Sequence, residues 1–298
     1  MIDLQKAKIA FKKYISSYDN QNDPGFNLKV VHTYHVVDNA IMISKKLGLS
    51  EEDINLAALI GILHDIGRFD ELKNLKKFDS VGNDHAMFAS KLLFEEGLIT
   101  KFIDTDKYNN IIKKAIENHN KKQIEEGLSD KELLHAKIIR DADKLDNYRV
   151  KQEERIENIF PGLVNNKEEL ENSLISDNVY NSVMKEECVD IKDRKYPLDY
   201  WICVLAFTFD LYFKETLLIV KENNYIDILI DRFNYNNSKE KMNKIRNVLN
   251  DYVEKKLNNW LIPNTQTTMV VSYLGIIPNT ETRLEHLALT LIQPIANP

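Results

Sequence analysis

Apolar residues recur at helical spacing along most of the chain, and this pattern predicts an all-α protein. Capping residues and glycines mark the expected helix ends. Ser50 is a typical N-cap, and Gly48 and Gly97 are typical of the position after a helix. We expect Asp23-Pro24-Gly25 to interrupt the chain and 70–84 to form a polar loop. The helices expected in the first half are Leu4–Tyr18, Val30–Leu47, Ser50 to about Asp65, His85–Glu96, Asp106–Asn118 and Asp130–Arg149.

We expect the second half to continue as helices beyond a joint at Pro161-Gly162. From Pro263 onward the helical pattern of residues ends. The stretch "TMVVSYLGII", after Pro263, is compatible with a strand. We therefore divide the chain into a helical domain at 1–160, a helical extension packed on it at 161–260, and a peripheral tail at 261–298. The helices expected in the extension are Lys167–Leu174, Asn178–Glu187, Pro197–Asn223 and Ser238–Asn259.

Composition narrows the class of protein. The chain has 298 residues with only 9 Gly and 7 Pro, which disfavours a turn-rich sandwich or barrel. A formal net charge of -6 makes nucleic acid an unfavourable partner. The most apolar run, "YWICVLAFTF", ends at Asp210 before it is long enough for a membrane span, and no signal-peptide core is present. With two cysteines, these features predict a cytoplasmic protein without membrane contact, and they are compatible with a homo-oligomer.

The stretch "AALIGILHDIGRF", residues 57–69, contains the most informative chemistry. An apolar helix ends in His64-Asp65, and a carboxylate beside an imidazole in apolar surroundings needs a partner. Further imidazoles and carboxylates occur on or at the ends of other expected helices. Nitrogen and oxygen ligands without a thiolate suit a borderline or hard divalent metal, and helices can bring them together in a bundle core. The segments concerned contain His32, Asp84-His85, Asn118-His119-Asn120 and Asp141-Ala142-Asp143.

These segments resemble the HD-domain phosphohydrolase superfamily over about residues 28–149. The motifs that carry the resemblance are "HTYHVVDNA", "AALIGILHDIGRF", "DHAMFASKLLFEEG", "NHN" and "IIRDADKLD". The resemblance implies an all-α HD-domain helical bundle, here with additional C-terminal helices and a short non-helical tail. It also implies two divalent transition metal ions, drawn from Mn, Fe, Co, Ni and Zn.

The family pattern can be carried over residue by residue. His32, His64, Asp65 and Asp143 would hold the first metal, Asp65 would bridge, and His85 with His119 would hold the second. Two alternatives stay open: His35 competes with His32, and Asp146 competes with Asp143. The family pattern favours His32, which is followed by Thr33, and favours Asp143, which follows Ala142. We expect Asp141 to be an ordinary surface acid.

The resemblance implies hydrolysis of a phosphoester or phosphoanhydride in a small phosphorylated molecule, with a nucleotide as the expected substrate. A metal-bridging hydroxide would attack phosphorus, with His64 and Asp65 as central residues and Arg68 and Lys144 as candidate phosphate ligands. The acid that protonates the leaving group stays open between His35 and His135. Two other functions use the same residues: a diiron oxygenase of the inositol-oxygenase kind, and a non-catalytic nucleotide sensor.

Overall fold

The computed structural model describes residues 2–18, 23–75, 84–160 and 162–261, with only the backbone of residues 71–75 and 261. The chain divides into two compact units, Met1–Asn258 and Asn259–Pro298. In its described ranges the chain contains helices and no strand, which confirms the all-α prediction. The strand considered for the tail lies outside the described residues. None of the helices described is both long and apolar enough to cross a lipid bilayer.

The first half forms a bundle of helices that follow the predicted pattern closely. Its elements are α1 Leu4–Ile15, α2 Pro24–Lys46, α3 Glu51–Leu63, α4 Ile66–Leu75, α5 His85–Ser90, a π-helical turn Lys91–Glu95, a 3-10 turn Leu98–Lys101, α6 Asn109–Asn118 and α7 Asp130–Glu153. Ser50 caps α3 through a hydrogen bond from the backbone N–H of Asp53, as predicted. Gly48 and Gly97 both adopt a positive φ after the preceding helix, also as predicted.

Two of the predicted interruptions in the first half are wrong. Asp23-Pro24-Gly25 begins α2, because Asp23 accepts hydrogen bonds from the N–H groups of Gly25 and Phe26, and Pro24 suits the first helical turn. The predicted loop from Asp70 begins inside α4, while residues 76–83 lie outside the described residues. The burial of Phe69 helps to explain why these residues form a helix. Its side chain is fully buried, and its ring lies edge-on against the ring of Phe26.

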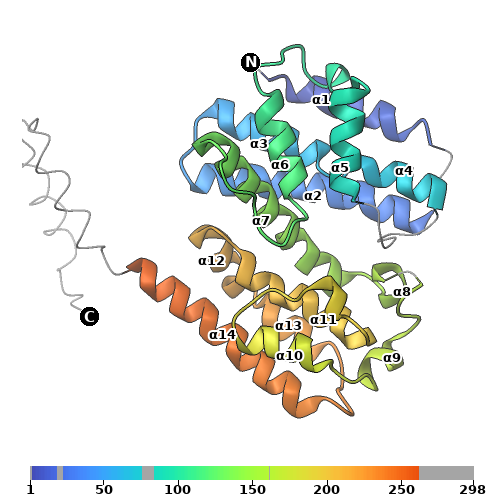
Figure 1. Ribbon diagram of the computed structural model, residues 1–298, viewed down its shortest axis with the longest axis vertical. Helices are drawn as coiled ribbons and strands as arrows, with labels where there is room; N and C mark the ends of the chain where they lie inside the picture. Colours follow the sequence, from blue (N-terminus) through green and yellow to red (C-terminus); the bar gives the residue numbers. More distant parts are fainter. Residues whose placement is uncertain (1, 19–22, 76–83, 161, 262–298) are drawn as a thin grey trace, which may run out of the picture. The chain divides into compact units, whose positions relative to one another are not determined.

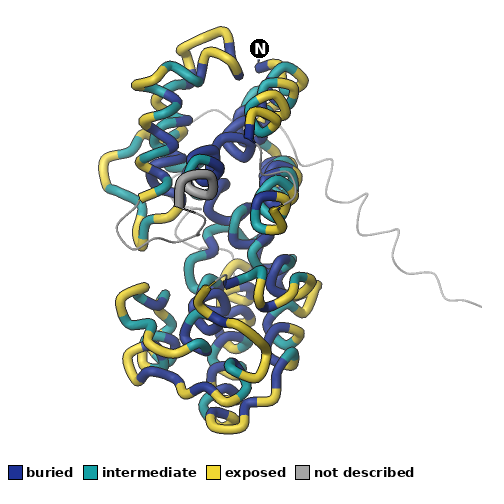
Figure 2. The backbone as a smooth tube through the Cα atoms, turned by 90° about the vertical axis from the view of Figure 1, so that its right-hand side faces the viewer, coloured by how far each residue is buried: buried dark blue, intermediate teal, exposed yellow. Residues whose placement is uncertain are grey.

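The core of the bundle lies between α2, α3 and α7, with α6 against α7 and α5 between α6 and α4 (Figure 1). Buried residues follow the inner faces of these helices, and exposed residues follow the outer faces (Figure 2). Close packing of α2 on α3 depends on Gly61, where an added Cβ would lie 3.1 Å from the Cα of Val37. The long helix α7 therefore lies where several other helices can place side chains beside it.

The second half contributes several short helices and the long helix α14, and some of these helices also pack against α7. The elements are α8 Ile156–Ile159, α9 Lys167–Glu171, α10 Asp177–Met184, a 3-10 turn Ile191–Asp193, α11 Pro197–Leu205, a 3-10 turn Ala206–Asp210, α12 Lys214–Glu222, α13 Tyr225–Asp231 and α14 Lys239–Leu261. Of these, α8, α11, α12 and α13 contact α7. The proposed boundary at 160 stays a prediction.

The single helix predicted over Pro197–Asn223 is wrong, because the chain turns between α11 and α12. The backbone N–H groups of Tyr212 and Phe213 donate to the carboxylate of Asp141 on α7 at 2.9 Å and 3.1 Å. Asp141 is therefore fully buried, which also corrects the prediction of a surface acid. Its burial raises the pKa of the carboxyl group to about 7, although the two N–H donors favour the charged form.

Candidate metal centre

The His64-Asp65 pair lies at the junction between α3 and α4. The backbone N–H of His64 still donates to the carbonyl of Ile60, so His64 continues the last turn of α3. Gly67, in the first turn of α4, lets that turn approach α5, because an added Cβ would lie 3.0 Å from the carbonyl oxygen of His85. This close approach brings Asp65 and His85 to the same place.

A first group of ligand atoms comes from His32, His64 and Asp143, which we call triad A. One atom of each side chain lies within 4.8 Å of the other two. His32 is on α2, His64 follows α3, and Asp143 is on α7, so three helices that pack on one another supply the group. The Nε2 atom of His32 lies 3.1 Å from a carboxylate oxygen of Asp143.

A second group comes from Asp65, His85 and His119, which we call triad B, and its ligand atoms also lie within 4.8 Å of one another. His85 is the first residue of α5, and His119 ends α6. Their Nε2 atoms lie 3.1 Å apart. All three side chains of triad B are largely buried.

Asp65 lies between the two triads and presents one carboxylate oxygen to each. Its Oδ2 lies 3.8 Å from Nε2 of His32 and 3.7 Å from Nε2 of His64. Its Oδ1 lies 3.5 Å from Nε2 of His85 and 3.6 Å from Nε2 of His119. The structure therefore brings together all six side chains that the sequence pattern selected as ligands, with Asp65 in the central position.

The hydrogen bonds of the imidazoles show which nitrogen is available as a ligand. Nδ1 of His64 lies 2.8 Å from the carbonyl of Gly61, and Nδ1 of His119 lies 2.7 Å from the carbonyl of Ile116. Because a carbonyl oxygen only accepts, each Nδ1 carries the proton and each Nε2 keeps its lone pair. Nδ1 of His32 is held in the same way by the carboxylate of Asp146, at 2.6 Å.

Two of these Nε2 atoms, in His32 and His64, are buried without a hydrogen-bond partner. A buried polar atom without a partner is unfavourable unless something absent from the structure fills its place. Imidazole nitrogens oriented by a carboxylate or carbonyl behind them are typical of metal ligands. The residues present therefore fit a divalent metal in triad A, and the donor set of triad B has the same nitrogen and oxygen chemistry.

The electrostatics favour the metal-binding protonation states of His64, His85 and the two carboxylates, whereas Asp143 and Asp146 raise the pKa of His32 although burial opposes it. Burial lowers the pKa of His64 to about 4 and lowers that of His85 well below its ordinary value, so both rings are neutral at pH 7. Although burial opposes it, the neighbouring His32 ring lowers the pKa of Asp143. The pKa of Asp65 also lies well below its ordinary value, where Lys29 and His64 outweigh burial. Both carboxylates are therefore charged.

Two cations reach the central carboxylate. The ammonium nitrogen of Lys29, one turn before His32 on α2, lies 2.8 Å from Oδ2 of Asp65. Nε of Arg68 lies 3.8 Å from Oδ1 of the same residue, and the Arg68 side chain is largely buried. The sequence pattern selected Arg68 but missed Lys29. The signal that could have found Lys29 is its position three residues before a candidate ligand on the same helix.

Lys144, the other predicted phosphate ligand, is engaged elsewhere. Its ammonium nitrogen lies 2.8 Å from the carboxylate of Asp210, which also pairs with the guanidinium of Arg140. In the part of the chain that the structure describes, neither triad lies within ion-pair distance of Lys144. Lys144, although adjacent to Asp143 in sequence, is therefore directed to the segment between α11 and α12.

Arg140 is a site residue that the sequence pattern missed. Its guanidinium donates to the carbonyls of Asn118 and Lys121, at 2.6 Å each, and so caps the end of α6 around His119. Asn120 donates to Asp84, the N-cap of α5, at 2.9 Å and so ties the two ends that carry triad B. No sequence motif indicated that these loops would hold the ligands together.

The remaining candidates lie outside both triads. Asp146 binds the far side of His32, so the structure gives it a supporting position rather than one in the triad. His35, three residues after His32 on α2, is half-buried and belongs to neither triad. His135 is buried with its Nε2 3.4 Å from Asp53, and no member of either triad lies within ion-pair distance of it in the described residues. His286 lies outside the described residues.

Comparison with known proteins supports the resemblance. The family model described as HD domain matches residues 30–148. The matched region extends from α2 into the end of α7 and contains every residue of the two triads. No curated protein and no solved structure matches the chain significantly.

Proposed function

We propose that this chain, whose residues 30–148 match the HD-domain family model, is a metal-dependent phosphohydrolase acting on a small phosphorylated molecule. The observation that carries the proposal is the position of Asp65, with one carboxylate oxygen directed to each of two buried triads. A shared carboxylate between two nitrogen-rich groups is the arrangement that a pair of divalent ions needs.

The ligand side chains fall into two groups, and each group would hold one metal ion. Triad A would hold one ion, triad B would hold the other, and Asp65 would bridge them. Two divalent ions in such a centre lower the pKa of water toward neutrality and neutralise charge on a phosphoryl group in the transition state. The protein holds the imidazoles in the required tautomer and keeps the surroundings dry, since the His64 side chain is fully buried.

Phosphate is the substrate group that the nearby cations favour. Arg68 lies beside Asp65 and can donate two parallel hydrogen bonds to a phosphoryl group. Lys29 offers a second positive charge on the opposite carboxylate oxygen. We assign these two residues to binding and orienting the phosphate. Lys144 is left out of this role because its ammonium group lies beside Asp210, which belongs to neither triad.

The test is metal-dependent turnover. Protein purified without chelator should contain up to two transition metal ions per chain, measured by elemental analysis. A panel of nucleotides, phosphomonoesters and phosphodiesters should show phosphate or nucleotide release that chelation abolishes and Mn, Fe, Co, Ni or Zn restores. Replacing His64→Ala should reduce turnover by about 10³-fold or more, because metal catalysis supplies several kcal/mol. His135→Ala, a buried histidine outside the triads, is the matched control.

Two outcomes would replace the proposal. Oxygen uptake with a polyol or phosphonate, together with a mixed-valent iron signal and no hydrolysis, would identify a diiron oxygenase. Tight nucleotide binding without turnover under any of the metals would identify a sensor. If the substrate is a nucleotide, nucleotides should be the best substrates in the panel; preference for another phosphorylated compound would change the substrate class but leave the reaction.

A further inference from the structure

A pocket separate from the metal centre lies between α1 and α2. It has a volume of about 370 Å³ and is lined by Gln5, Lys8, Ile9, Lys12 and Tyr34. Tyr34 is two residues after His32 on α2, and two residues correspond to about 200° of helical rotation. The Tyr34 side chain therefore faces away from the metal centre, toward α1, where its ring lies edge-on against Phe11.

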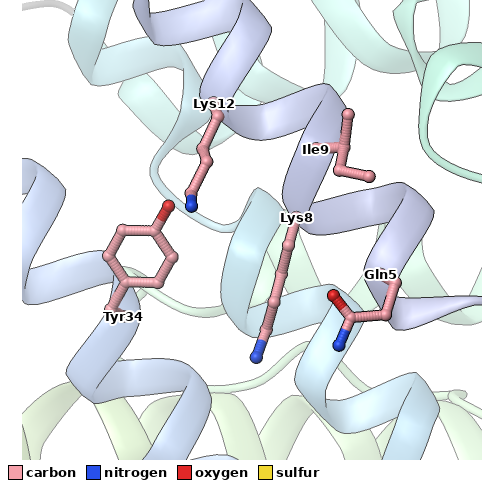
Figure 3. A pocket seen from close by; sticks show the side chains of 5 residues that line it. All are labelled: Gln5, Lys8, Ile9, Lys12 and Tyr34. Atoms are coloured by element: carbon pink, nitrogen blue, oxygen red, sulfur yellow. The ribbon is translucent and has the colours of Figure 1, made fainter.

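The polar side-chain groups that line this pocket have no hydrogen-bond or ion-pair partner among the described residues. The hydroxyl oxygen of Tyr34 is buried and has no hydrogen-bond partner. In the described residues, no carboxylate lies within ion-pair distance of Lys8 or Lys12, whereas Lys6 on the same helix pairs with Asp104. Figure 3 shows the Tyr34 hydroxyl turned toward the ammonium end of Lys12, with Lys8 and Gln5 extending beside it. Several hydrogen-bond donors thus face one space.

Their chemistry selects an anion with several oxygens. Two ammonium groups supply positive charge, and the amide of Gln5 can donate through its NH2 group. Burial raises the pKa of Tyr34, so its hydroxyl keeps its proton and can also donate. Phosphate oxygens accept from such a set at several points. Ile9 is 66% exposed at the rim and offers an apolar contact to an organic group attached to the phosphate.

We propose that Lys8, Lys12, Tyr34 and Gln5 form a second, non-catalytic site for the phosphate group of a small molecule. The size of the pocket favours a small ligand over a polymer, and the net charge of -6 disfavours a polyanion. The site does not depend on the proposed hydrolase reaction, because none of its residues belongs to either triad.

Calorimetric titration of the full chain tests the site. The chain should be free of metal and keep Asp65, because its carboxylate stays beside Lys29 and Arg68 and repels phosphate from the metal centre. The probes are inorganic phosphate and adenosine monophosphate, with chloride at equal ionic strength as the reference. We expect saturable binding of at least one probe. Tighter binding of the monophosphate would identify an organic ligand, and equal affinities would identify free phosphate.

Variants then locate the bound phosphate. Lys12→Gln and Lys8→Gln should each weaken binding about three- to tenfold, since each removes a charge-assisted hydrogen bond at a partly solvated position. Tyr34→Phe keeps the ring against Phe11 and should weaken binding about fivefold. Lys13→Gln removes the same charge from an adjacent position on α1 outside the pocket and should leave affinity unchanged. An equal loss with Lys13→Gln, or no binding of either probe, would overturn the proposal.

Discussion

Triads A and B contain similar atoms but are supported by different parts of the molecule. The histidines of triad A come from α2 and the end of α3, and its carboxylate comes from the middle of α7. Triad B takes its histidines from the first residue of α5 and the residue after α6. Two ligands of triad A, His32 and Asp143, are thus held by the packing of whole helices, whereas both histidines of triad B lie at helix ends, which need additional contacts.

Those additional contacts come partly from outside the matched family region. Arg140 holds the carbonyls at the end of α6, and Asp210, which follows α11, pairs with Arg140. Triad A is supported instead by contacts within the region: Asp146 holds His32, the carbonyl of Gly61 holds His64, and the amide of Asn147 donates to Asp143. The comparison indicates that residues beyond 148 matter more for the second metal position than for the first.

Removal of the carboxylate that the two triads share should have the largest effect on metal binding. Asp65→Ala should abolish binding at both metal positions, because its two oxygens face both triads. Asp143→Ala, its matched control, should lose only the metal of triad A. Elemental analysis should give near zero and near one ion per chain, with turnover reduced by about 10³-fold or more in both. Equal metal contents in the two variants would contradict the central role of Asp65.

A large effect is also expected from Asp210→Asn. The substitution leaves the guanidinium of Arg140 and the ammonium of Lys144 buried without their carboxylate. We expect the free energy of unfolding to fall by about 3 kcal/mol, measured in urea, and triad B to lose metal before triad A. Asp227→Asn, which breaks a more exposed ion pair with Arg246, should change it by less than about 1 kcal/mol. Similar losses of stability and of metal in the two variants would contradict the proposed link between Asp210 and triad B.

A moderate effect on triad A alone is expected from Asp146→Asn. The carboxylate orients the His32 ring through Nδ1, and such supporting contacts contribute about 10- to 100-fold to metal affinity. Metal titration should show one weakened position and one unchanged. Asp53→Asn, which alters the acid beside the non-ligand His135, should leave both unchanged. Weakening of both positions by Asp146→Asn would show that the triads are not independently supported.

The smallest effect concerns pH and a histidine outside both triads. Burial lowers the pKa of His135 in the folded chain, so below pH about 6.5 the unfolded chain takes up a proton that the folded chain does not. Its contribution to stability is therefore complete above that pH and is lost as the pH falls. Urea unfolding of chelator-treated protein between pH 7.5 and 5 should show a shallower decline for His135→Gln than for the unchanged chain. An identical decline of stability in the two proteins would show that groups other than His135 cause the pH dependence.

Local sequence signals were sufficient for most of the helices and for the candidate ligands. Ser50 and Gly48 mark helix ends because their side chain or backbone freedom acts within a few residues. The same signals failed at Pro24, where a residue typical of turns begins a helix, and over Pro197–Asn223, where a distant carboxylate turns the chain. Propensity does not contain information about contacts between residues far apart in sequence.

The sequence by itself determined the all-α class and the set of imidazoles and carboxylates, because helical periodicity and residue chemistry are local properties. Only the tertiary structure decided that Asp65 lies between two triads, that Lys29 reaches it, and that Asp141 is buried. It also directed Lys144 to Asp210 rather than to the centre. These arrangements depend on how helices pack and on which buried charges find partners, and both are settled by contacts across the whole bundle.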